Sequence, residues 1–336
     1  QAPLDAIRKI AEGNDSSSND ELYQGLINLG INNLLITEDN GGLGLDLLFA
    51  VAISQSLGAG IATLPFIGPY VMAPIAIKHA ANEMQKNTLF EGMVNNSINF
   101  SIGFSEYFGS RDSSGLTFSQ NKVSGKTLFV LDGDYASHVM LCNKDGQIGV
   151  VSLDSVGIET INLTTVDKTR MYQEMNFDNT PIEILENSLT SSNAIELSID
   201  AGRIVAAADS IGASQYMIDK AIEYSKERKQ FNRVIGSFQA VKHMCAEMAA
   251  DLEPCYSLVW HAAHSFDNHE ADSRLMACHA KSHVSEISKI ISKKATEVHG
   301  GMGFTELLGL HFWFKRIGRN RHILGSPEIV REEAAR

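Results

Sequence analysis

Cysteine is scarce in this sequence. Only 4 of the 336 residues are cysteines, namely Cys142, Cys245, Cys255 and Cys278, and no Cys-x-x-Cys pair occurs. This scattered usage argues against a disulfide framework. We therefore expect reduced, structural thiols in a reducing compartment.

Positive charge and long apolar runs are scarce as well. The formal net charge of −12 argues against a general nucleic-acid binder, although a local basic patch can still hold a pyrophosphate. No apolar run approaches the roughly 20 residues that a membrane-spanning helix needs. No signal peptide is visible, but the numbering starts at Gln1, which leaves a removed segment open. We expect a cytoplasmic protein with no membrane partner.

The periodicity of the apolar residues divides the chain into three parts. Residues 1–96 read as helices, one of them at 75–90, interrupted by a glycine-rich loop at 36–45. Residues 97–190 switch to short period-two segments without intervening helices, which predicts an antiparallel sandwich or barrel. The expected strands include 138–142, 148–152 and 169–174. Residues 191–336 return to helical spacing, which predicts an up-down four-helix bundle. The expected bundle helices are 193–227, 238–268, 271–299 and 320–335.

The stretch 223–250 carries the most distinctive chemistry. Two helical patterns meet there across the segment Arg228-Lys229-Gln230-Phe231-Asn232-Arg233, which holds three cations and an aromatic ring. Cations and backbone N–H groups at helix ends suit a phosphate or pyrophosphate. Cations are also favoured at any solvated helix C-terminus, and the residues alone favour that simpler interpretation.

The order of residues in this stretch resembles the acyl-CoA dehydrogenase family. The family pattern R-x-x-F-G-x-x-I-x-x-F-Q is matched by Arg228, Phe231, Ile235, Phe238 and Gln239. Two further stretches, ITEDNGGLGL at 36–45 and EVHGGMGFTE at 297–306, follow the family's order and spacing. The resemblance runs over nearly the whole chain. It implies an FAD-dependent flavoprotein that acts on an acyl-CoA thioester, with an N-terminal helical domain, a middle antiparallel β-domain and a C-terminal four-helix bundle.

The resemblance also shows that the usual catalytic base is missing. In the family, a Glu near the C-terminus or early in the first bundle helix removes the α proton of the thioester. These two positions hold Leu324 and Gly202. Asp209 is the nearest substitute, and the alternative is a carboxylate that caps or pairs with a neighbouring helix. Arg203 and Gly325, beside the two altered positions, are the candidate substrate-binding residues.

The flavin contacts that the resemblance implies are altered in part. The candidate cofactor-binding residues are Phe104, Ser105, Phe129, Arg228, Gln230, Phe231, Glu297, Gly300 and Gly301. Leu131 lacks the hydroxyl that would reach the flavin edge, and the segment 105–110 is one residue short. Glu297 stands where the family has Gln, and a carboxylate repels a pyrophosphate.

A metal site is not expected. His279, His283 and Glu286 share one helical face at a spacing that could bind a metal. A solvated helix face explains the same spacing more simply.

Three functions remain open at this point. The first is a subunit of a heteromeric acyl-CoA dehydrogenase, in fatty acid or steroid side-chain degradation, whose partner chain supplies the base. Such a dimer or heterotetramer would pass electrons to electron-transfer flavoprotein or another acceptor. The second is a non-catalytic homo-oligomer that binds acyl-CoA or acts as a scaffold. The third is a self-sufficient dehydrogenase that uses Asp209.

Overall fold

The computed structural model describes residues 4–13, 17–108, 114–133, 135–188, 190 and 193–336. The chain forms two compact units: residues 1–11, 51–62 and 203–336 make one, and residues 12–50 and 63–202 make the other. We call the first the bundle unit and the second the sheet unit. The domain boundaries expected at 96 and 190 do not coincide with this division and stay predictions.

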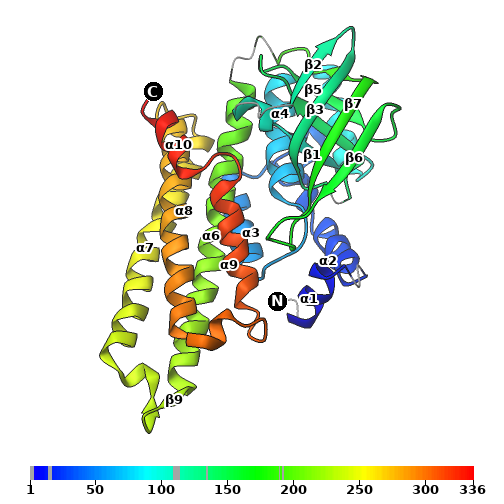
Figure 1. Ribbon diagram of the computed structural model, residues 1–336. Coiled ribbons are helices and arrows are strands. Elements are labelled where there is room, and N and C mark those ends of the chain that lie inside the picture. Colours follow the sequence, from blue (N-terminus) through cyan, green and yellow to red (C-terminus); the bar gives the residue numbers. More distant parts are fainter. Residues whose placement is uncertain (1–3, 14–16, 109–113, 134, 189, 191–192) are drawn as a thin grey trace. The chain divides into compact units, whose positions relative to one another are not determined.

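The sheet unit is built on a mixed sheet of eight strands within its described residues (Figure 1). In spatial order these are β6 (Ile158–Leu163), β7 (Tyr172–Pro181), β3 (Lys122–Leu131), β1 (Phe100–Gly103), β4 (His138–Cys142), β5 (Ile148–Ser152) and β8 (Glu183–Ile184), with β2 (Gly115–Ser119) beside β3. Strand β1 pairs with β4 in parallel, so the expectation of a purely antiparallel domain was wrong at this pair. The chain passes through β2 and β3 between them, which gives the long crossover that a parallel pair needs.

The core of the sheet unit is a cluster of buried apolar side chains. Strands β1, β4 and β5 are buried along almost their whole length, whereas exposed positions interrupt the burial of β3 and β7. The buried residues of this core are Leu116, Val123, Val130, Val139, Leu141, Val151, Met175, Phe177 and Ile182. The strands expected at 138–142 and 148–152 have the bounds of β4 and β5. The strand expected at 169–174 begins instead at Tyr172, because the carboxylate of Asp167 accepts the N–H of Thr169 at 3.0 Å and holds a turn there.

The helices of the sheet unit are short. They are α2 (Ser17–Asn28), η1 (Ile31–Asn33), η2 (Glu38–Asn40), η3 (Gly68–Met72), α4 (Ala73–Ala80), α5 (Glu83–Val94) and η4 (Ser105–Phe108). The single helix expected from 75 to 90 is therefore two helices. Ala81 is extended, and Asn82 starts α5 with a capping box in which its side chain accepts from the N–H of Gln85 at 2.8 Å.

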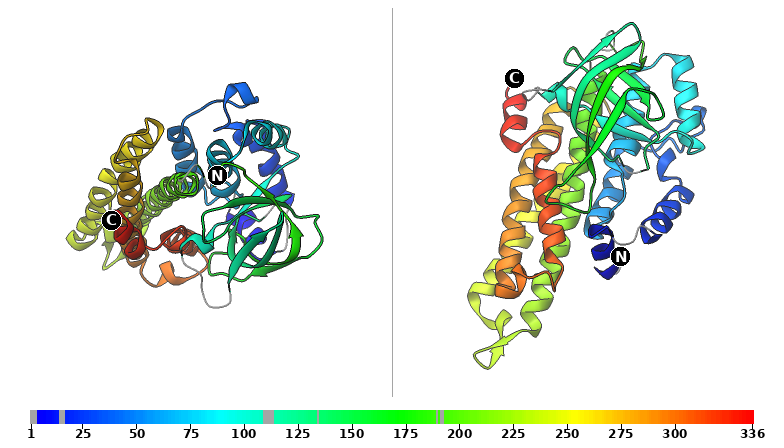
Figure 2. Two further views of the ribbon diagram at one scale, coloured as in Figure 1. Left: turned by 90° about the horizontal axis from the view of Figure 1, so that it is seen from above. Right: turned by 45° about the vertical axis from the view of Figure 1, so that its right-hand side comes forward.

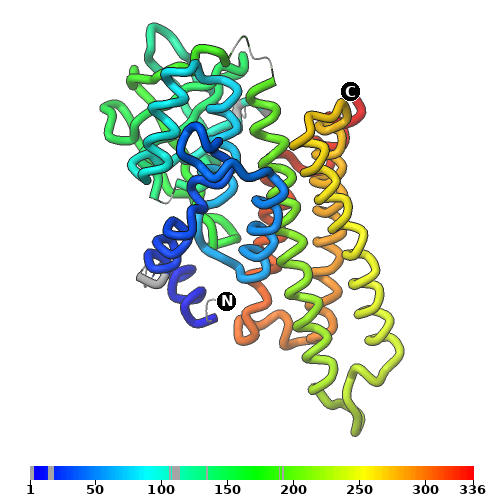
Figure 3. Tube along the Cα trace, turned by 180° about the vertical axis from the view of Figure 1, so that it is seen from behind, coloured from blue at the N-terminus to red at the C-terminus, as the bar shows by residue number. Residues whose placement is uncertain are grey.

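The bundle unit contains four long helices that lie side by side in Figure 2 and in Figure 3. They are α6 (Ala194–Glu227, in this unit from residue 203), α7 (Gln239–Asp267), α8 (Ser273–Val298) and α9 (Leu310–His322). The unit also has α1 (Leu4–Ala11), the end of α3 (Leu47–Ala59), β9 (Lys229–Gln230), β10 (Arg233–Val234), η5 (Ile235–Ser237), η6 (Gly300–Phe304) and α10 (Pro327–Ala334). The helical, β, helical order confirms the fold class.

The last predicted helix needs a correction. The helix expected at 320–335 is interrupted, because α9 ends at His322 and α10 begins at Pro327. Leu324 and Gly325 have positive φ angles of 55° and 102°, which no α-helix accepts. Proline at the first helical position then favours a new start at Pro327.

Helices α3 and α6 cross in direct backbone contact. A Cβ atom added at Gly58 would lie 2.0 Å from the carbonyl oxygen of Asp209, and one added at Gly212 would lie 1.9 Å from that of Gln55. Ser54 adds a hydrogen bond across the same crossing, from its Oγ to the carbonyl oxygen of Val205 at 2.9 Å. Glycine at both positions is what permits this approach.

Replacing Gly212 by alanine is therefore expected to lower the free energy of unfolding by about 1–3 kcal/mol, because an added carbon in a closed crossing forces the backbone apart. Urea unfolding at neutral pH measures this. Gly318→Ala in α9 is the matched control, since its added Cβ meets nothing within 4 Å. That variant should gain about 0.5–1 kcal/mol from helix propensity. Equal stability of the two variants would contradict the direct contact.

Two expectations about the whole chain can be compared with the described residues. No helix among them is long and apolar enough to cross a membrane. The four cysteines are free, and three of them are buried. Burial raises the pKa of Cys255 to about 11, with Asp251 adding to the effect, so this thiol stays protonated and unreactive at neutral pH.

Candidate functional site

A β-hairpin projects from one end of the bundle, between α6 and α7 (lower end of the bundle in Figure 1). Strands β9 and β10 pair around Phe231 and Asn232, whose φ angles are 52° and 62°. Two left-handed residues are what a tight two-residue hairpin requires. A phenylalanine in that conformation costs about 1–2 kcal/mol. The side chain of Phe231 is also 86% exposed, so its ring lies outside the core of this chain.

The hairpin tip is basic and held in shape by its own contacts. The guanidinium of Arg233 lies 3.9 Å from the ring centroid of Phe238, and Phe231 meets the same ring edge-on at 6.1 Å. The N–H of Ile235 closes the base of the hairpin on the carbonyl oxygen of Arg228 at 2.8 Å. Arg228, Lys229, Gln230 and Arg233 are all exposed. The tip therefore presents several donors and one ring to whatever approaches it.

A glycine loop lies at the same end of the bundle, after α8. The ring of His299 is tilted against Tyr224 at 4.6 Å, which joins the last turns of α8 and α6. Burial lowers the pKa of His299, so the ring is neutral at neutral pH. Gly300 has a φ of 58°, and neither it nor Gly301 has a heavy atom within 4 Å of an added Cβ. A ligand can therefore approach this backbone closely.

These two segments fit a ligand that combines phosphates with a flat ring. Arg228 and Gln230 offer donors, and Phe231 offers a ring face. Phe304, in the glycine loop, is 82% exposed and enlarges the apolar surface. Glu297 is exposed on the last turn of α8 and can only accept hydrogen bonds, so it disfavours a phosphate beside it.

The candidate flavin contacts of the sheet unit fit less well. Phe104 is buried in the core, and the Oγ of Ser105 donates to the carbonyl oxygen of Leu128. Phe129 sits in a β-bulge of β3 with a φ of 54°, and its half-exposed ring meets Tyr172 edge-on at 6.4 Å. A bulge re-aims a side chain, which leaves Phe129 available to cover a ring. Leu131 is buried and offers no hydroxyl. Gly109 and Ser110 of the short segment lie outside the described residues.

The position of the usual base lies in the turn between α9 and α10. Leu324 is buried there with its positive φ angle. The Nε of Arg203 donates to the carbonyl oxygen of Leu324 at 2.9 Å. The Nζ of Lys281 donates to the carbonyl oxygens of Asn320 and Arg321, at 2.6 and 3.1 Å. Basic side chains that donate to backbone carbonyl oxygens thus surround this turn, at which the resemblance implies a carboxylate.

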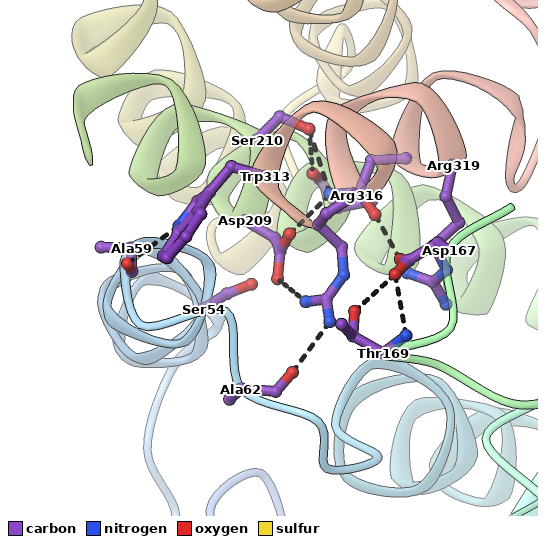
Figure 4. Close-up of polar contacts among 12 residues, drawn as sticks. Ser54, Ala59, Ala62, Asp167, Thr169, Asp209, Ser210, Trp313, Arg316 and Arg319 are labelled. Carbon is purple, nitrogen blue, oxygen red and sulfur yellow. Dashed lines mark hydrogen bonds and ion pairs between the residues drawn. The ribbon is translucent and has the colours of Figure 1, made fainter. Parts of the chain in front are cut away.

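Asp209 forms a buried ion pair with Arg316 (Figure 4). Its carboxylate lies 3.4 Å from Nη1 of Arg316, a side chain with 0% exposure, and accepts from Nδ2 of Asn320 at 2.6 Å. Nη2 of Arg316 also donates to the carbonyl oxygen of Ala62 at 2.9 Å. A carboxylate that compensates a buried arginine serves the fold, which favours the helix-pairing alternative over the catalytic one.

Other carboxylates near the turn are paired as well. Oε2 of Glu333 lies 2.8 Å from Nη1 of Arg203. Arg321 pairs with Glu286 at 2.6 Å and with Glu328 at 2.7 Å. A hydrogen bond from Ser326, followed by a backbone hydrogen bond and Arg321, lowers the pKa of Glu328 to about 2. A carboxylate this acidic is a poor proton acceptor.

A metal centre finds no support in the described residues, among which no cluster of His, Cys, Asp and Glu suited to a metal occurs. His279 and His283 are exposed on α8, and Glu286 is engaged with Arg321. The sequence analysis did not name two buried basic residues, Lys281 and Arg316. Lys281 was detectable in principle, because it falls four residues after Ala277 on the buried face of its helix.

The family assignment follows from comparison with known proteins. Residues 192–336 match the family described as acyl-CoA dehydrogenase, C-terminal domain, and residues 5–97 match acyl-CoA dehydrogenase, N-terminal domain. The chain belongs to the acyl-CoA dehydrogenase family. This confirms the resemblance that the motifs indicated.

Individual relatives differ in how much of the chain they match. Acyl-CoA dehydrogenase IpdE2 of Mycobacterium tuberculosis is 26% identical over 332 residues, which covers 97% of this chain and 89% of that protein. Caffeyl-CoA reductase-Etf complex subunit CarC of Acetobacterium woodii is 44% identical over 113 residues, which covers 34% of this chain and 29% of that subunit. A variant of the steroid ACAD Tcur3481-Tcur3483 shares the fold, with a TM-score of 0.87 at 23% identity, over 99% of this chain and 92% of that chain.

Asp209→Asn is expected to lower the free energy of unfolding by about 3 kcal/mol, because Arg316 is left buried without a counter-charge. Urea unfolding measures the loss, and Ser210→Ala, which alters a buried neighbour without changing charge, is the control. The double variant Asp209→Leu/Arg316→Met should recover much of the stability. If Asp209→Asn is as stable as the parent and only loses acyl-CoA-dependent reduction of an electron acceptor, Asp209 is the base.

Lys281 should make stability depend on alkaline pH. Burial lowers the pKa of Lys281 well below its ordinary value, and Arg203 and Arg321 lower it further. The unfolded chain therefore binds more protons than the folded chain between the two pKa values. The free energy of unfolding should rise through that window, by up to about 1.4 kcal/mol per pH unit, towards the ordinary value near 10.4. Lys281→Met should lack this rise, whereas Lys293→Met, on an exposed face, should keep it. If the free energy of unfolding depends on pH in the same way in all three proteins, Lys281 is not the source of the rise.

Proposed function

We propose that this chain is a subunit of a heteromeric acyl-CoA dehydrogenase that binds FAD and an acyl-CoA thioester while a partner chain supplies the base. The turn at Leu324 carries this proposal. The position is buried, it lies among cationic donors, and the carboxylates described around it are ion-paired. The chain keeps ligand-binding features of its family, whereas the carboxylates described around this turn are engaged in ion pairs.

The chemistry explains why a partner is needed. FAD, when bound, supplies the hydride acceptor for the β hydrogen of the substrate. Removal of the α proton needs a positioned base, and its absence costs roughly 10²–10⁴-fold in rate. The residues of this chain would bind and orient: Arg228 and Gln230 hold phosphates, and Phe231 covers a ring. Backbone N–H groups near Gly325 donate hydrogen bonds to the thioester oxygen.

The hairpin supports the partner-dependent form of the function. Its strained, exposed Phe231 and its exposed cations lie outside the core of the described chain, where Phe231 and Arg233 contact the neighbouring ring of Phe238. They become useful when a second chain brings a cofactor against them. The names of two similar proteins agree with such assemblies. One is called a subunit of a caffeyl-CoA reductase-Etf complex. The other is a steroid ACAD whose name gives two components, Tcur3481 and Tcur3483. An electron-transfer flavoprotein as acceptor and a cytoplasmic location belong to the same proposal.

A second candidate is a non-catalytic homo-oligomer that binds acyl-CoA. The same turn favours it, because backbone donors suffice for binding while chemistry needs a base. The two candidates differ in whether co-expression with a partner chain creates activity. The third function, a self-sufficient dehydrogenase, is disfavoured by the ion pair between Asp209 and Arg316.

The purified chain alone is expected to retain little FAD and to show no acyl-CoA-dependent reduction of a dye. Co-expression with its partner subunit should give a yellow complex that reduces the dye. The visible spectrum after gel filtration and a dye assay with a series of acyl-CoA esters measure both properties.

Phe231→Asn tests the role of the hairpin, because asparagine tolerates the left-handed conformation but removes the ring. This variant should lower FAD retention in the complex, whereas Met84→Asn, which alters another exposed apolar side chain, should not. Stoichiometric FAD and turnover in the chain alone would overturn the proposed function.

A further inference from the structure

Helix α1 belongs to the bundle unit, although the chain that follows it does not. The helix has eight residues, Leu4–Ala11, and residues 12–50 are part of the sheet unit. A helix this short is marginal in water by itself. Ile7 is only 2% exposed, so α1 is docked rather than surrounded by solvent. Its contacts with the bundle unit therefore decide whether it stays in place.

Arg8 supplies the polar contacts of this docking. Its Nη2 donates to the carbonyl oxygens of Glu306 and Leu307, both at 2.7 Å. Its Nη1 lies 3.3 Å from Oδ1 of Asp5, which is one turn earlier in α1. Hydrogen bonds from a charged donor are stronger than neutral ones. Arg8 thus ties α1 to residues that lie 298 and 299 positions further along the chain.

The segment that Arg8 holds connects η6 to α9. It comprises residues 305–309 and has no regular structure. The N–H of Gly309 closes a turn on the carbonyl oxygen of Glu306 at 3.1 Å, and Gly309 has a φ of 68°. A Cβ atom added at Gly309 would lie 2.6 Å from Cδ2 of Leu4. Glycine therefore lets α1 approach the end of this segment closely.

The same segment carries exposed apolar side chains. Phe304, which ends the glycine loop, is 82% exposed, and Leu307 is 72% exposed. The carbonyl oxygen of Leu307 is nevertheless held by Arg8, so the backbone at this residue is fixed while its side chain faces solvent. Arg8 thus restrains the chain directly after the glycine loop.

We propose that Arg8 is a positioning residue, which docks α1 on residues 306 and 307, orders the segment 304–309 and thereby supports the retention of FAD in the assembled enzyme. The inference rests on the proposed function, because it needs a cofactor at the glycine loop. Arg8 itself has no contact with that cofactor in this role. Its loss should loosen the segment without unfolding the bundle.

Hydrogen exchange of the full chain measures this local order. In Arg8→Ala the N–H groups of Thr305 and Gly309, which are hydrogen-bonded in the parent, should exchange about 5- to 10-fold faster, the factor that corresponds to about one net hydrogen bond. Exchange in the hairpin 229–234 should stay as in the parent, whereas a general loss of stability would speed both. Lys9→Ala is the matched control, because it removes an exposed cation from the same helix.

The ring of His311 reports the docking of α1 separately. Burial and the neighbouring Lys315 lower the pKa of His311, Glu306 raises it, and Arg8 lowers it further. The pKa of His311 should therefore be higher in Arg8→Ala than in the parent and should not change in Lys9→Ala. An NMR titration of the histidine rings measures both. An equal pKa in the parent and in Arg8→Ala overturns the docking through Arg8.

The cofactor is tested in the complex with the partner subunit. Fluorescence titration with FAD should show an affinity about 3- to 10-fold weaker for the Arg8→Ala complex than for the parent and Lys9→Ala complexes. Faster exchange of the segment with an unchanged FAD affinity overturns the inference, as does unchanged exchange, and both leave the proposed function intact. A parent complex that binds no FAD overturns the proposed function and this inference with it.

A second variant covers the case in which Arg8→Ala does not fold. Leu4→Ser removes the apolar contact with Gly309 and leaves Arg8 in place, so it loosens α1 from the other side. The N–H groups of Thr305 and Gly309 should again exchange faster than in the parent. Unchanged exchange in that variant then overturns the inference.

Discussion

The bundle depends on the compensation of a buried arginine. Arg316 has no exposure, and the carboxylate of Asp209 is its ionic partner on α6. Through the carbonyl oxygen of Ala62, the same guanidinium also holds the chain that follows α3. Because an uncompensated buried charge costs several kcal/mol, this arrangement commits Asp209 to the fold. The glycine crossing of α3 and α6 lies at the same level, since the carbonyl oxygen of Asp209 faces Gly58.

Burial of basic side chains also shapes the chemistry of the turn that follows the C-terminal end of α9. Arg203 and Lys281 are buried cations whose acceptors are mainly backbone carbonyls and one glutamate. A carboxylate at position 324 would have these charges nearby and would be stabilised in its ionised form, which weakens it as a base. The loss of the family's Glu and the cationic surroundings of the turn are therefore consistent with each other.

The sequence predicted the elements whose signals are local and repeated. Helices α6, α7 and α8 and strands β4 and β5 followed from periodicity, and the family followed from three spaced motifs. The parallel pairing of β1 with β4 was not predictable, because it depends on which strands meet across the sheet. The break at Leu324 was missed because a leucine gives no sign of a left-handed conformation. The partners of Asp209 were missed because Arg316 is 107 residues away, and only the fold brings them together.

The hairpin beyond α6 has a consequence for the speed of assembly. Its two left-handed residues, its ring contacts and its closing hydrogen bond already exist in the single chain. The hairpin is already ordered when the chain has folded. A partner that docks on it therefore does not add the entropic cost of ordering this surface. Encounter is then limited by diffusion and orientation. A disordered tip would have coupled assembly to a folding step.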